Sequence, residues 1–535
     1  MLLFAAACVS GADAPAGTPD ADSALPLACT EPSAGIDRFT RQDAARGLTI
    51  PFEYPWDAWD GMITTGVALM AVDDLDADGD LDFMQGRLAG APMVFANDGK
   101  GFFASAIDLP ALVAPPEIPM LGVLSISTAD LDGDALPDVI AAGRSFVEVY
   151  WNLGGLSFSQ PIAIHIDPIA GDAIYQPLSL ADFDGDGVLD MALPPVTHAT
   201  APPGEDGVPL PIRMYYQRDG TFVRGPDLVA NGIGSVTLVS LASDRDADGD
   251  MDLFVFADRL FPNLVWRNDG VGSDGFPVFV EEAADLVLDA VVAAMGVDSA
   301  DLNGDGALDY CVTDTTPPKC WLSDGAGRYY EGALALGLVP ADPADETYGT
   351  VGWSFDLVDL DNDAALDAVQ ASGPCTNQIR DGVQVPYADL LWHGTAEGTF
   401  VDVSEAVGFA DTSDNYSMVT ADFDGDGAWE IVVGGPGAPP KFYQNRCTVG
   451  AWLDILLVGA PGNAPAFGAR VEVDVGGVTQ IREQYGLRSP ASGPREMHFG
   501  LGNVDVVDAI RVLWPDGERS EVGQTAARQR LVIGR

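Results

Sequence analysis

The stretch Asp182-Phe-Asp-Gly-Asp-Gly-Val-Leu-Asp190 decides how this chain of 535 residues is organised. Its carboxylates at positions 1, 3, 5 and 9 are too close together to stay charged without a cation between them. This number of hard oxygen ligands favours calcium. Gly187 at position 6 permits the positive φ that wraps the backbone around an ion, so the carbonyl of Val188 can serve as a further ligand. The apolar run that follows, Met191-Ala-Leu, predicts a strand.

Close copies of this nine-residue pattern recur along the chain. Successive copies start 56, 52, 62, 57, 58 and 63 residues apart, and the seven starts are Asp74, Asp130, Asp182, Asp244, Asp301, Asp359 and Asp422. A single cluster of Asp and Gly is equally well explained as an ordinary turn, but seven copies in register are not. A repeat of this length suits one four-stranded blade of a propeller.

The repeats resemble the calcium-binding propeller repeats called FG-GAP or VCBS, which occur in integrin α-subunits and many secreted bacterial proteins. The resemblance covers residues 36–447. It implies an all-β fold with a seven-bladed β-propeller that binds one Ca²⁺ in an inter-strand loop of each blade, on one face of the ring. Up to seven ions are therefore expected.

The expected ligands are the residues at positions 1, 3, 5, 7 and 9 of every loop, with position 7 contributing its carbonyl wherever it is not acidic. They are Asp74, Asp76, Asp78, Asp80, Asp82, Asp130, Asp132, Asp134, Leu136, Asp138, Asp182, Asp184, Asp186, Val188, Asp190, Asp244, Asp246, Asp248, Asp250, Asp252, Asp301, Asn303, Asp305, Ala307, Asp309, Asp359, Asp361, Asp363, Ala365, Asp367, Asp422, Asp424, Asp426, Ala428 and Glu430.

Two loops depart from the pattern at position 6, where Ala135 and Ala364 replace glycine. A Cβ atom at positive φ costs about 1 to 2 kcal/mol. We therefore expect the second and sixth loops to bind calcium more weakly than the others. Asn303 and Glu430 also depart from the consensus, but both keep an oxygen ligand.

The net charge of −55 would be typical of a disordered chain, but 47% of the residues are hydrophobic and aromatic residues occur throughout, which predicts a folded protein. Positions 1, 3, 5 and 9 of the loops hold 27 of the 81 acidic residues, and seven divalent ions would offset fourteen charges. The surface would remain acidic, which argues against nucleic acid as a partner.

Two of the six cysteines, Cys311 and Cys320, lie on short apolar runs separated by a turn that contains Thr-Thr-Pro-Pro. This spacing predicts a cross-strand disulfide inside the fifth blade. Cys29, Cys375 and Cys447 cannot be paired from the sequence.

The start of the chain, Met-Leu-Leu-Phe-Ala-Ala-Ala-Cys8, resembles the end of a bacterial lipoprotein signal, although no Lys or Arg precedes its apolar run. We interpret residues 1–8 as a signal remnant and 9–35, rich in Ala, Pro, Ser, Gly and Asp, as a flexible linker behind a lipid-modified Cys8. We expect an extracellular or cell-surface protein of a bacterial envelope, in particular an outer-membrane lipoprotein.

The segment from Phe39 to Leu48 has the same spacing as the segments that begin at Phe400 and Tyr329, which we interpret as outer strands of blades. After the seventh loop the chain passes directly into a different pattern, so the last blade lacks such a segment. We expect residues near 37–42 to supply this strand and to close the ring, which removes an exposed sheet edge.

Residues 448–535 lack the aspartate loops and predict a separate β domain. Trp452–Val458, Arg470–Val475 and Ile510–Trp514 read as strands, and Gly476-Gly477 and Asp516-Gly517 read as turns. Together with Phe467-Gly-Ala-Arg and His498-Phe-Gly-Leu-Gly, they resemble the ASPIC/UnbV domain that follows such repeats in cartilage acidic protein and its bacterial relatives.

The rest of the sequence offers little catalytic chemistry. It contains no nucleophile, phosphate-loop or dinucleotide motif. Its four histidines are not spaced as a metal pair; we assign His498 to the C-terminal domain and read His165, His198 and His393 as surface or loop residues. Two long stretches, 195–210 and 370–388, are expected to be loops of the kind that carries binding sites.

These observations favour a monomeric, exported, calcium-stabilised scaffold that binds a protein or a glycan. Two alternatives stay open. Some calcium propellers are polysaccharide lyases whose acid and base are scattered over the propeller face, so an enzyme is not excluded by sequence. The chain is also compatible with an assembly or maturation factor for other envelope proteins.

Overall fold

The computed structural model describes most of the chain from residue 38 onward. The described ranges are 38–52, 69–87, 90–111, 123–143, 146–166, 174–175, 178–196, 211–230, 237–257, 261–315, 317–339, 351–373, 379–380, 383–384, 388–435, 437–446, 450–486 and 491–535. The predicted signal and linker, with Cys8 and Cys29, lie outside these ranges, as do His198, Cys375 and Cys447.

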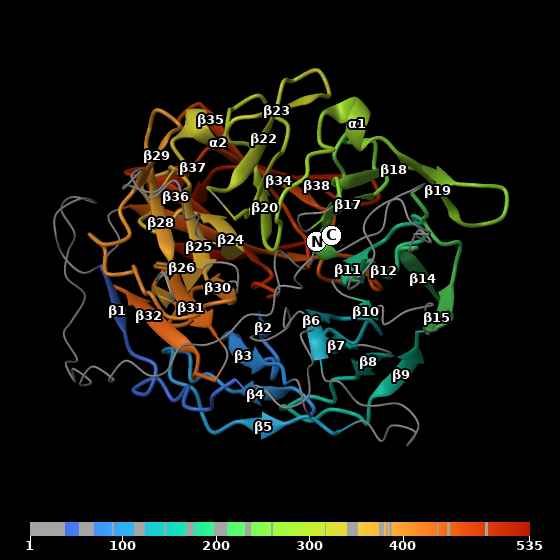
Figure 1. The fold of residues 1–535 in the computed structure, drawn as a ribbon, viewed down its shortest axis with the longest axis horizontal. Helices are drawn as coiled ribbons and strands as arrows, with labels where there is room; N and C mark the ends of the chain where they lie inside the picture. Colours follow the sequence, from blue (N-terminus) through green and yellow to red (C-terminus); the bar gives the residue numbers. More distant parts are fainter. Residues whose placement is uncertain are drawn as a thin grey trace.

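Seven four-stranded antiparallel sheets of the described chain follow one another around a common centre (Figure 1). The first three are β2 (Met70–Asp73), β3 (Asp82–Gln85), β4 (Met93–Phe95) and β5 (Ile107–Asp108); β6 (Val123–Ala129), β7 (Asp138–Gly143), β8 (Phe146–Tyr150) and β9 (Ile162–His165); and β11 (Ser179–Ala181), β12 (Asp190–Leu193), β14 (Arg213–Arg218) and β15 (Thr221–Arg224).

The fourth to sixth sheets continue the same order from the centre outward. They are β16 (Thr237–Ser243), β17 (Asp252–Ala257), β18 (Leu264–Val271) and β19 (Pro277–Glu281); β20 (Val297–Ala300), β21 (Asp309–Val312), β22 (Lys319–Ser323) and β23 (Tyr329–Glu331); and β24 (Gly352–Val358), β25 (Asp367–Ser372), β28 (Leu390–Gly394) and β29 (Phe400–Asp402). Every metal loop of the sequence pattern joins the first two strands of its sheet, which makes each repeat one blade and confirms the all-β propeller.

Ring closure also follows the prediction. The seventh sheet contains β30 (Ser417–Ala421), β31 (Glu430–Gly434) and β32 (Lys441–Asn445), and its fourth strand is β1 (Phe39–Arg41) from the other end of the chain. Phe39 pairs with Asn445 and Arg41 with Tyr443 in an antiparallel register. The Phe39 ring packs against Phe409 with ring centroids 6.1 Å apart, so the closing strand is anchored by side chains as well as by its backbone.

Buried hydrophobic clusters fill the junctions between blades. One cluster joins the first and second blades through Leu69, Ile126 and Tyr150, and another joins the seventh and first through Phe423 and Phe83. Comparable clusters lie at the other five junctions. Inner strands such as β16 and β17 are buried along their whole length because both faces pack on neighbouring blades, whereas the outer strand β19 alternates buried and exposed residues.

The predicted disulfide is present in the fifth blade. Cys311 on β21 and Cys320 on β22 are directly opposite in the sheet register, and a disulfide joins them across 4.0 Å between Cα atoms. Both residues are fully buried.

Short helices and strands lie between the main strands of the blades. Two one-turn helices, α1 (Ala283–Leu286) and α2 (Ala333–Leu336), follow the outer strands of the fourth and fifth blades. The stretch 195–210, predicted to be a loop, begins with the short strand β13 (Pro195–Val196), which pairs with β10 (Ile174–Tyr175). The stretch 370–388 was also predicted to be a loop, but residues 370–372 belong to β25, and β26 (Ile379–Arg380) pairs with β27 (Val383–Gln384).

The C-terminal module packs two sheets around its own core. One contains β35 (Val478–Glu483), β34 (Arg470–Val475), β38 (Ala509–Leu513) and β39 (Arg519–Val522), and the other contains β36 (Glu496–Gly502), β33 (Ala451–Val458) and β41 (Gln529–Gly534). A two-stranded pair, β37 (Val506–Val507) and β40 (Thr525–Ala526), completes it. Leu453, Val471, Phe499 and Trp514 lie in the shared core.

This module lies against the propeller and is bonded to it by backbone groups. Ser492 donates to the carbonyl of Met70 at 3.0 Å and accepts from the amide of Val72 at 3.1 Å. Leu189 donates to Gly462, and Gly502 donates to Asn362. These contacts reach the first, third and sixth blades at or beside their metal loops, so the loop face carries the C-terminal module.

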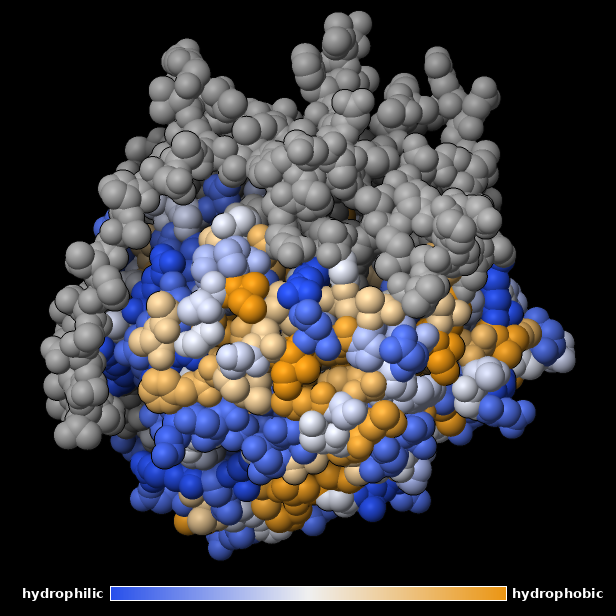
Figure 2. All heavy atoms as spheres, turned by 90° about the horizontal axis from the view of Figure 1, so that it is seen from below, coloured by the Kyte–Doolittle hydropathy of each residue, from blue (hydrophilic) through white to orange (hydrophobic). Residues whose placement is uncertain are grey.

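The outer flank of the ring mixes apolar and polar side chains. Phe102, Ile107, Leu153 and Ile162 on the first two blades are 44 to 64% exposed. Figure 2 looks at the flank that carries these blades and shows apolar residues interspersed with hydrophilic ones. Within the described ranges, no helix is both long enough and apolar enough to cross a membrane.

Candidate metal sites in the seven loops

All seven loops share one hydrogen-bonding scheme. The amide of position 6 donates to the Asp at position 1, at 2.8 to 3.1 Å. The amide of position 7 donates to the side chain at position 5, at 2.8 to 3.2 Å. Asp residues at these positions therefore shape the loop, and their remaining oxygen lone pairs stay available to a cation.

The acid at position 9 ties its loop to the rest of the blade. In six loops it accepts the amide of position 2, at 2.8 to 3.1 Å. In six loops it also accepts an amide in or just after the third strand of the same blade, at 2.6 to 2.9 Å. The position 9 side chain is thus both a predicted ligand and a structural brace.

An amide side chain in or just after the third strand joins neighbouring blades, which sequence reasoning did not anticipate. Asn97 donates to Leu81 of its own loop and to Phe423 of the preceding blade's loop. The residues that make the same inter-blade bond are Asn152, Gln217, Asn268 and Asn445. Ser323 and Gly394 occupy this position in the fifth and sixth blades. In four blades the amide residue recurs 14 to 16 positions after the last acid of the loop, and in the third blade 27 positions after it; the first spacing is the signal that could have revealed it.

We expect Asn152→Ala to lower the free energy of unfolding by about 2 to 4 kcal/mol, because it leaves the buried carbonyls of Leu75 and Pro137 without their donor. Ser323→Ala is the matched control at the same position of another blade and should cost less than about 1.5 kcal/mol. Urea unfolding of both variants in calcium buffer measures the difference. Equal losses would show that the inter-blade bond does not stabilise the ring.

Backbone conformation in the loops revises the predicted ranking of affinities. Position 6 has positive φ as predicted, with 71° at Ala135 and 78° at Ala364. Position 4 has positive φ as well, at Ala77, Gly133, Gly185, Ala247, Gly304, Asn362 and Gly425. The first and fourth loops therefore carry the same strain at a different residue, and position 6 alone does not rank the loops. Only the third, fifth and seventh loops have glycine at both positions.

The carboxylates converge as a divalent ion requires. In the first four loops, three of them offer oxygens within 4.8 Å of one another: Asp74, Asp76 and Asp78; Asp130, Asp132 and Asp138; Asp182, Asp184 and Asp190; and Asp244, Asp246 and Asp248. Two oxygens bound to one calcium at about 2.4 Å lie at most about 4.8 Å apart.

Several of these oxygens are buried without a hydrogen-bond partner. They include one oxygen each of Asp74, Asp80, Asp252 and Asp424, and both oxygens of Asp361, which has an ion-pair partner in Arg38. A buried acceptor left unpaired costs free energy that a bound cation would recover. The residues present therefore fit a calcium ion in these loops.

The electrostatic environment of the loop carboxylates also favours a bound cation. Burial raises the pKa of Asp82, Asp138 and Asp309 to about 7, and neighbouring carboxylates of the loops add to the rise. Burial raises the pKa of Asp190 and Asp252 to about 8. The protein itself therefore does not neutralise these acids, and a divalent cation would do so.

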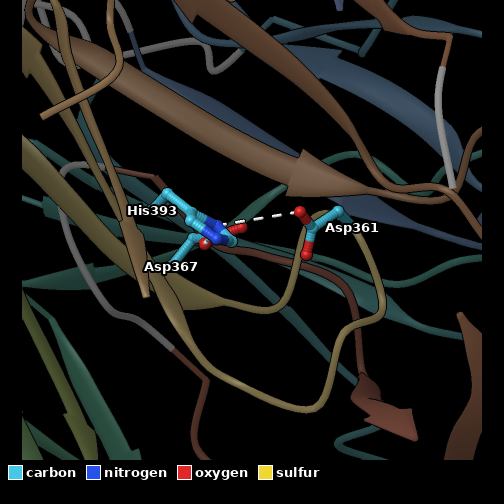
Figure 3. A group of neighbouring side chains, drawn as sticks. All are labelled: Asp361, Asp367 and His393. Atoms are coloured by element: carbon cyan, nitrogen blue, oxygen red, sulfur yellow. Dashed lines mark hydrogen bonds and ion pairs between the residues drawn. The ribbon is translucent and has the colours of Figure 1, made fainter. Parts of the chain in front are cut away.

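His393 corrects the prediction that it is a surface or loop residue. It lies on β28 with its side chain 21% exposed, and Nδ1 is 3.0 Å from Asp367 of the sixth loop (Figure 3). His498 is buried in the C-terminal module, as assigned, and its Nδ1 contacts Asp454 at 2.6 Å. His165 ends strand β9.

The C-terminal module covers loops with polar groups of its own. Arg530 donates to the carbonyl of Gly79 at 2.7 Å, and Arg470 donates to that of Gly306 at 2.5 Å, so two loops present position 6 to an arginine. Glu483 accepts the amide of Asp244 at 2.9 Å. His498 Nε2 lies 3.0 Å from the carbonyl oxygen of Asp359. Much of the propeller face that carries the predicted metal loops is therefore an interface with the C-terminal module.

Comparison with known families agrees with this architecture. Residues 74–141 and 130–193 match the model of the FG-GAP-like repeat, and residues 459–535 match the model called ASPIC and UnbV. The chain thus contains FG-GAP-like propeller repeats and a C-terminal ASPIC/UnbV domain, as the motifs predicted. The matched repeats span the first three loops. No curated protein matches the chain.

Solved structures resemble it only distantly. A structure on recognition of non-reducing terminal N-acetylglucosamine by an Agrocybe aegerita lectin is 20% identical, covering 66% of this chain and 85% of that one with a TM-score of 0.42. BBS1N in complex with ARL6DN is 11% identical, with coverages of 70% and 92% and a TM-score of 0.42. The Dos1 propeller is 9% identical, with coverages of 68% and 75% and a TM-score of 0.38.

Proposed function

We propose that this protein is an exported calcium-binding β-propeller that serves as a cell-surface or extracellular binding scaffold for a protein or a glycan. The observation that carries the proposal is the convergence of loop carboxylates whose buried oxygens lack hydrogen-bond partners. Calcium would be held by the acids at positions 1, 3, 5 and 9 and by the group at position 7, and it would neutralise charges that the protein leaves uncompensated.

Two features support an extracellular setting. The Cys311–Cys320 disulfide belongs in an oxidising compartment. Loops of this kind in extracellular modules bind calcium at about 10⁻⁴ to 10⁻³ M, which suits the calcium concentrations found outside cells. A lipid anchor through Cys8 is part of the same proposal, and mass spectrometry of the native N-terminus would detect the acylated cysteine.

The binding role is supported by the architecture rather than by a catalytic group. In the described part of the chain, the polar groups at the loops shape the loops, offer oxygens to an ion and contact the C-terminal module. A rigid ring with long insertions between its strands is a common platform for recognition.

The proposal is tested with the full chain, loaded with calcium, on an array of defined glycans and against proteins of an envelope fraction by cross-linking. We expect saturable binding to one of these classes, and a loss of binding after chelation. New unsaturated ends on polysaccharides incubated with the protein would instead support the lyase alternative. Binding to neither class would contradict the scaffold proposal.

A further inference from the structure

The sixth loop differs from the other six in burial. All seven loops lie in the described ranges, and only here are the carboxylates of positions 1 and 3 both buried, with Asp359 and Asp361 each 1% exposed. The C-terminal module covers this loop through His498 and Gly502. Any charge in the sixth loop is therefore compensated by protein groups or by an ion, and not by water.

A buried arginine already faces these carboxylates. Arg38 Nη1 lies 3.2 Å from Asp361 Oδ2, and both side chains are at most 6% exposed. Arg38 Nε donates to Asn445 Oδ1 at 3.2 Å, which fixes the guanidinium in this position. Because Arg38 directly precedes the closing strand β1, it cannot leave the loop unless that end of the ring opens.

An imidazole occupies the other side of the same loop. His393 Nδ1 is 3.0 Å from Asp367 Oδ1 and 3.7 Å from Asp361 Oδ2, and its Nε2 is 3.8 Å from Asp363 Oδ2. Figure 3 shows the ring directed at Asp361 and Asp367. One ring nitrogen and one oxygen of each carboxylate all lie within 4.8 Å of one another, so an ion between positions 3 and 9 would meet a nitrogen.

These groups do not fit a calcium ion. A divalent cation bound to Asp361 would lie close to the permanent positive charge of Arg38 in a buried environment, where repulsion between like charges is strong. An ion held by Asp361 and Asp367 would also have the His393 nitrogen as a neighbour. Oxygen ligands suit calcium, whereas an imidazole nitrogen does not.

Arginines near two other loops do not have this effect. Arg218 contacts Asp184 and Asp186 of the third loop, but its side chain is 35% exposed and can turn into solvent. Arg245 in the fourth loop contacts Asp246 at 3.1 Å and also pairs with Glu282, an acid outside the loop, at 2.6 Å. Glu282 is shared with Arg267, which pairs with Asp269 as well, so two acids outside the loop balance the two arginines. The third and fourth loops therefore stay able to bind an ion.

We infer that the sixth loop holds no calcium and that Arg38 and His393 take the place of the ion. The ring is then closed by a protein ion pair between Arg38 and Asp361, so closure does not depend on calcium. This inference rests on the proposed function, because it concerns one loop of a set of which the other six bind calcium.

Bound calcium per chain, measured by equilibrium dialysis and atomic emission, tests the inference. We expect six ions for the unchanged protein. Asp184→Asn in the third loop should reduce the number to five, whereas Asp361→Asn at the same position of the sixth loop should leave six. The double variant Arg38→Gln, His393→Asn should gain one ion, and Arg218→Ala, the control, should not.

The outcomes separate the two claims. Seven ions in the unchanged protein, or the loss of one with Asp361→Asn, would overturn the inference and leave the proposed function intact. No bound calcium would overturn the proposed function and the inference together. Should the double variant fail to fold, the pair of single Asp→Asn variants still decides between six and seven sites.

Discussion

Removing calcium with a chelator should lower the melting temperature of this protein by more than about 10 °C. Outside the sixth loop, each loop gathers three to five carboxylates whose mutual repulsion an ion would compensate. A site with a dissociation constant of about 10⁻⁴ M contributes about 2.7 kcal/mol at 10 mM calcium, and one of about 10⁻³ M contributes about 1.4 kcal/mol. Six such sites together rival the whole stability of a typical domain, which is about 5 to 15 kcal/mol.

Calorimetry at a series of free calcium concentrations measures this effect. The largest change in melting temperature should fall between about 10⁻⁴ and 10⁻³ M free calcium. Magnesium at the same concentration is the control and should restore little stability, because it demands a smaller and more regular ligand set. A melting temperature that does not respond to calcium would refute the role of the loops in folding.

Phe39→Ala should cost about 3 to 5 kcal/mol of unfolding free energy. Phe39 is only 2% exposed and packs with Phe409, Val407 and Tyr443 at the junction of the last two blades. Its removal leaves a cavity under the closing strand, which would expose the edge of β32 to pairing with other chains. We therefore expect aggregation at lower temperature in addition to the lower stability.

Urea unfolding and size-exclusion chromatography of Phe39→Ala test ring closure. Tyr330→Ala on the outer strand of the fifth blade is the control, because Tyr330 is 49% exposed and its loss should cost less than about 0.5 kcal/mol. If the two variants behaved alike, β1 would not contribute to the ring in solution.

The sequence predicted the features that depend on short, local patterns of residues. Each aspartate loop carries its own glycines and acids, so blade number and loop position follow from counting repeats. Closure by the first strand followed from a missing element, since an outer segment resembling Phe400–Asp402 was absent after Asn445 and present at Phe39. The Cys311–Cys320 disulfide followed from a short turn between two apolar runs.

The features that the sequence did not predict depend on which blades become neighbours. Asn152 contacts Leu75 across 77 positions of sequence, and His498 reaches Asp359 across 139. Nothing in the residues near His393 or Arg38 reveals that they meet in one loop, because they come from strands far apart in the chain. The position of the C-terminal module on the loop face likewise depends on contacts between segments that are far apart in the chain.

Anomalous diffraction from crystals grown with calcium would test the central claim, that the aspartate loops are calcium sites. The account predicts one peak in each of the loops that begin at Asp74, Asp130, Asp182, Asp244, Asp301 and Asp422, placed among the carboxylates of positions 1, 3 and 5, and no peak in the loop that begins at Asp359. The absence of peaks from all of these loops at millimolar calcium would contradict it.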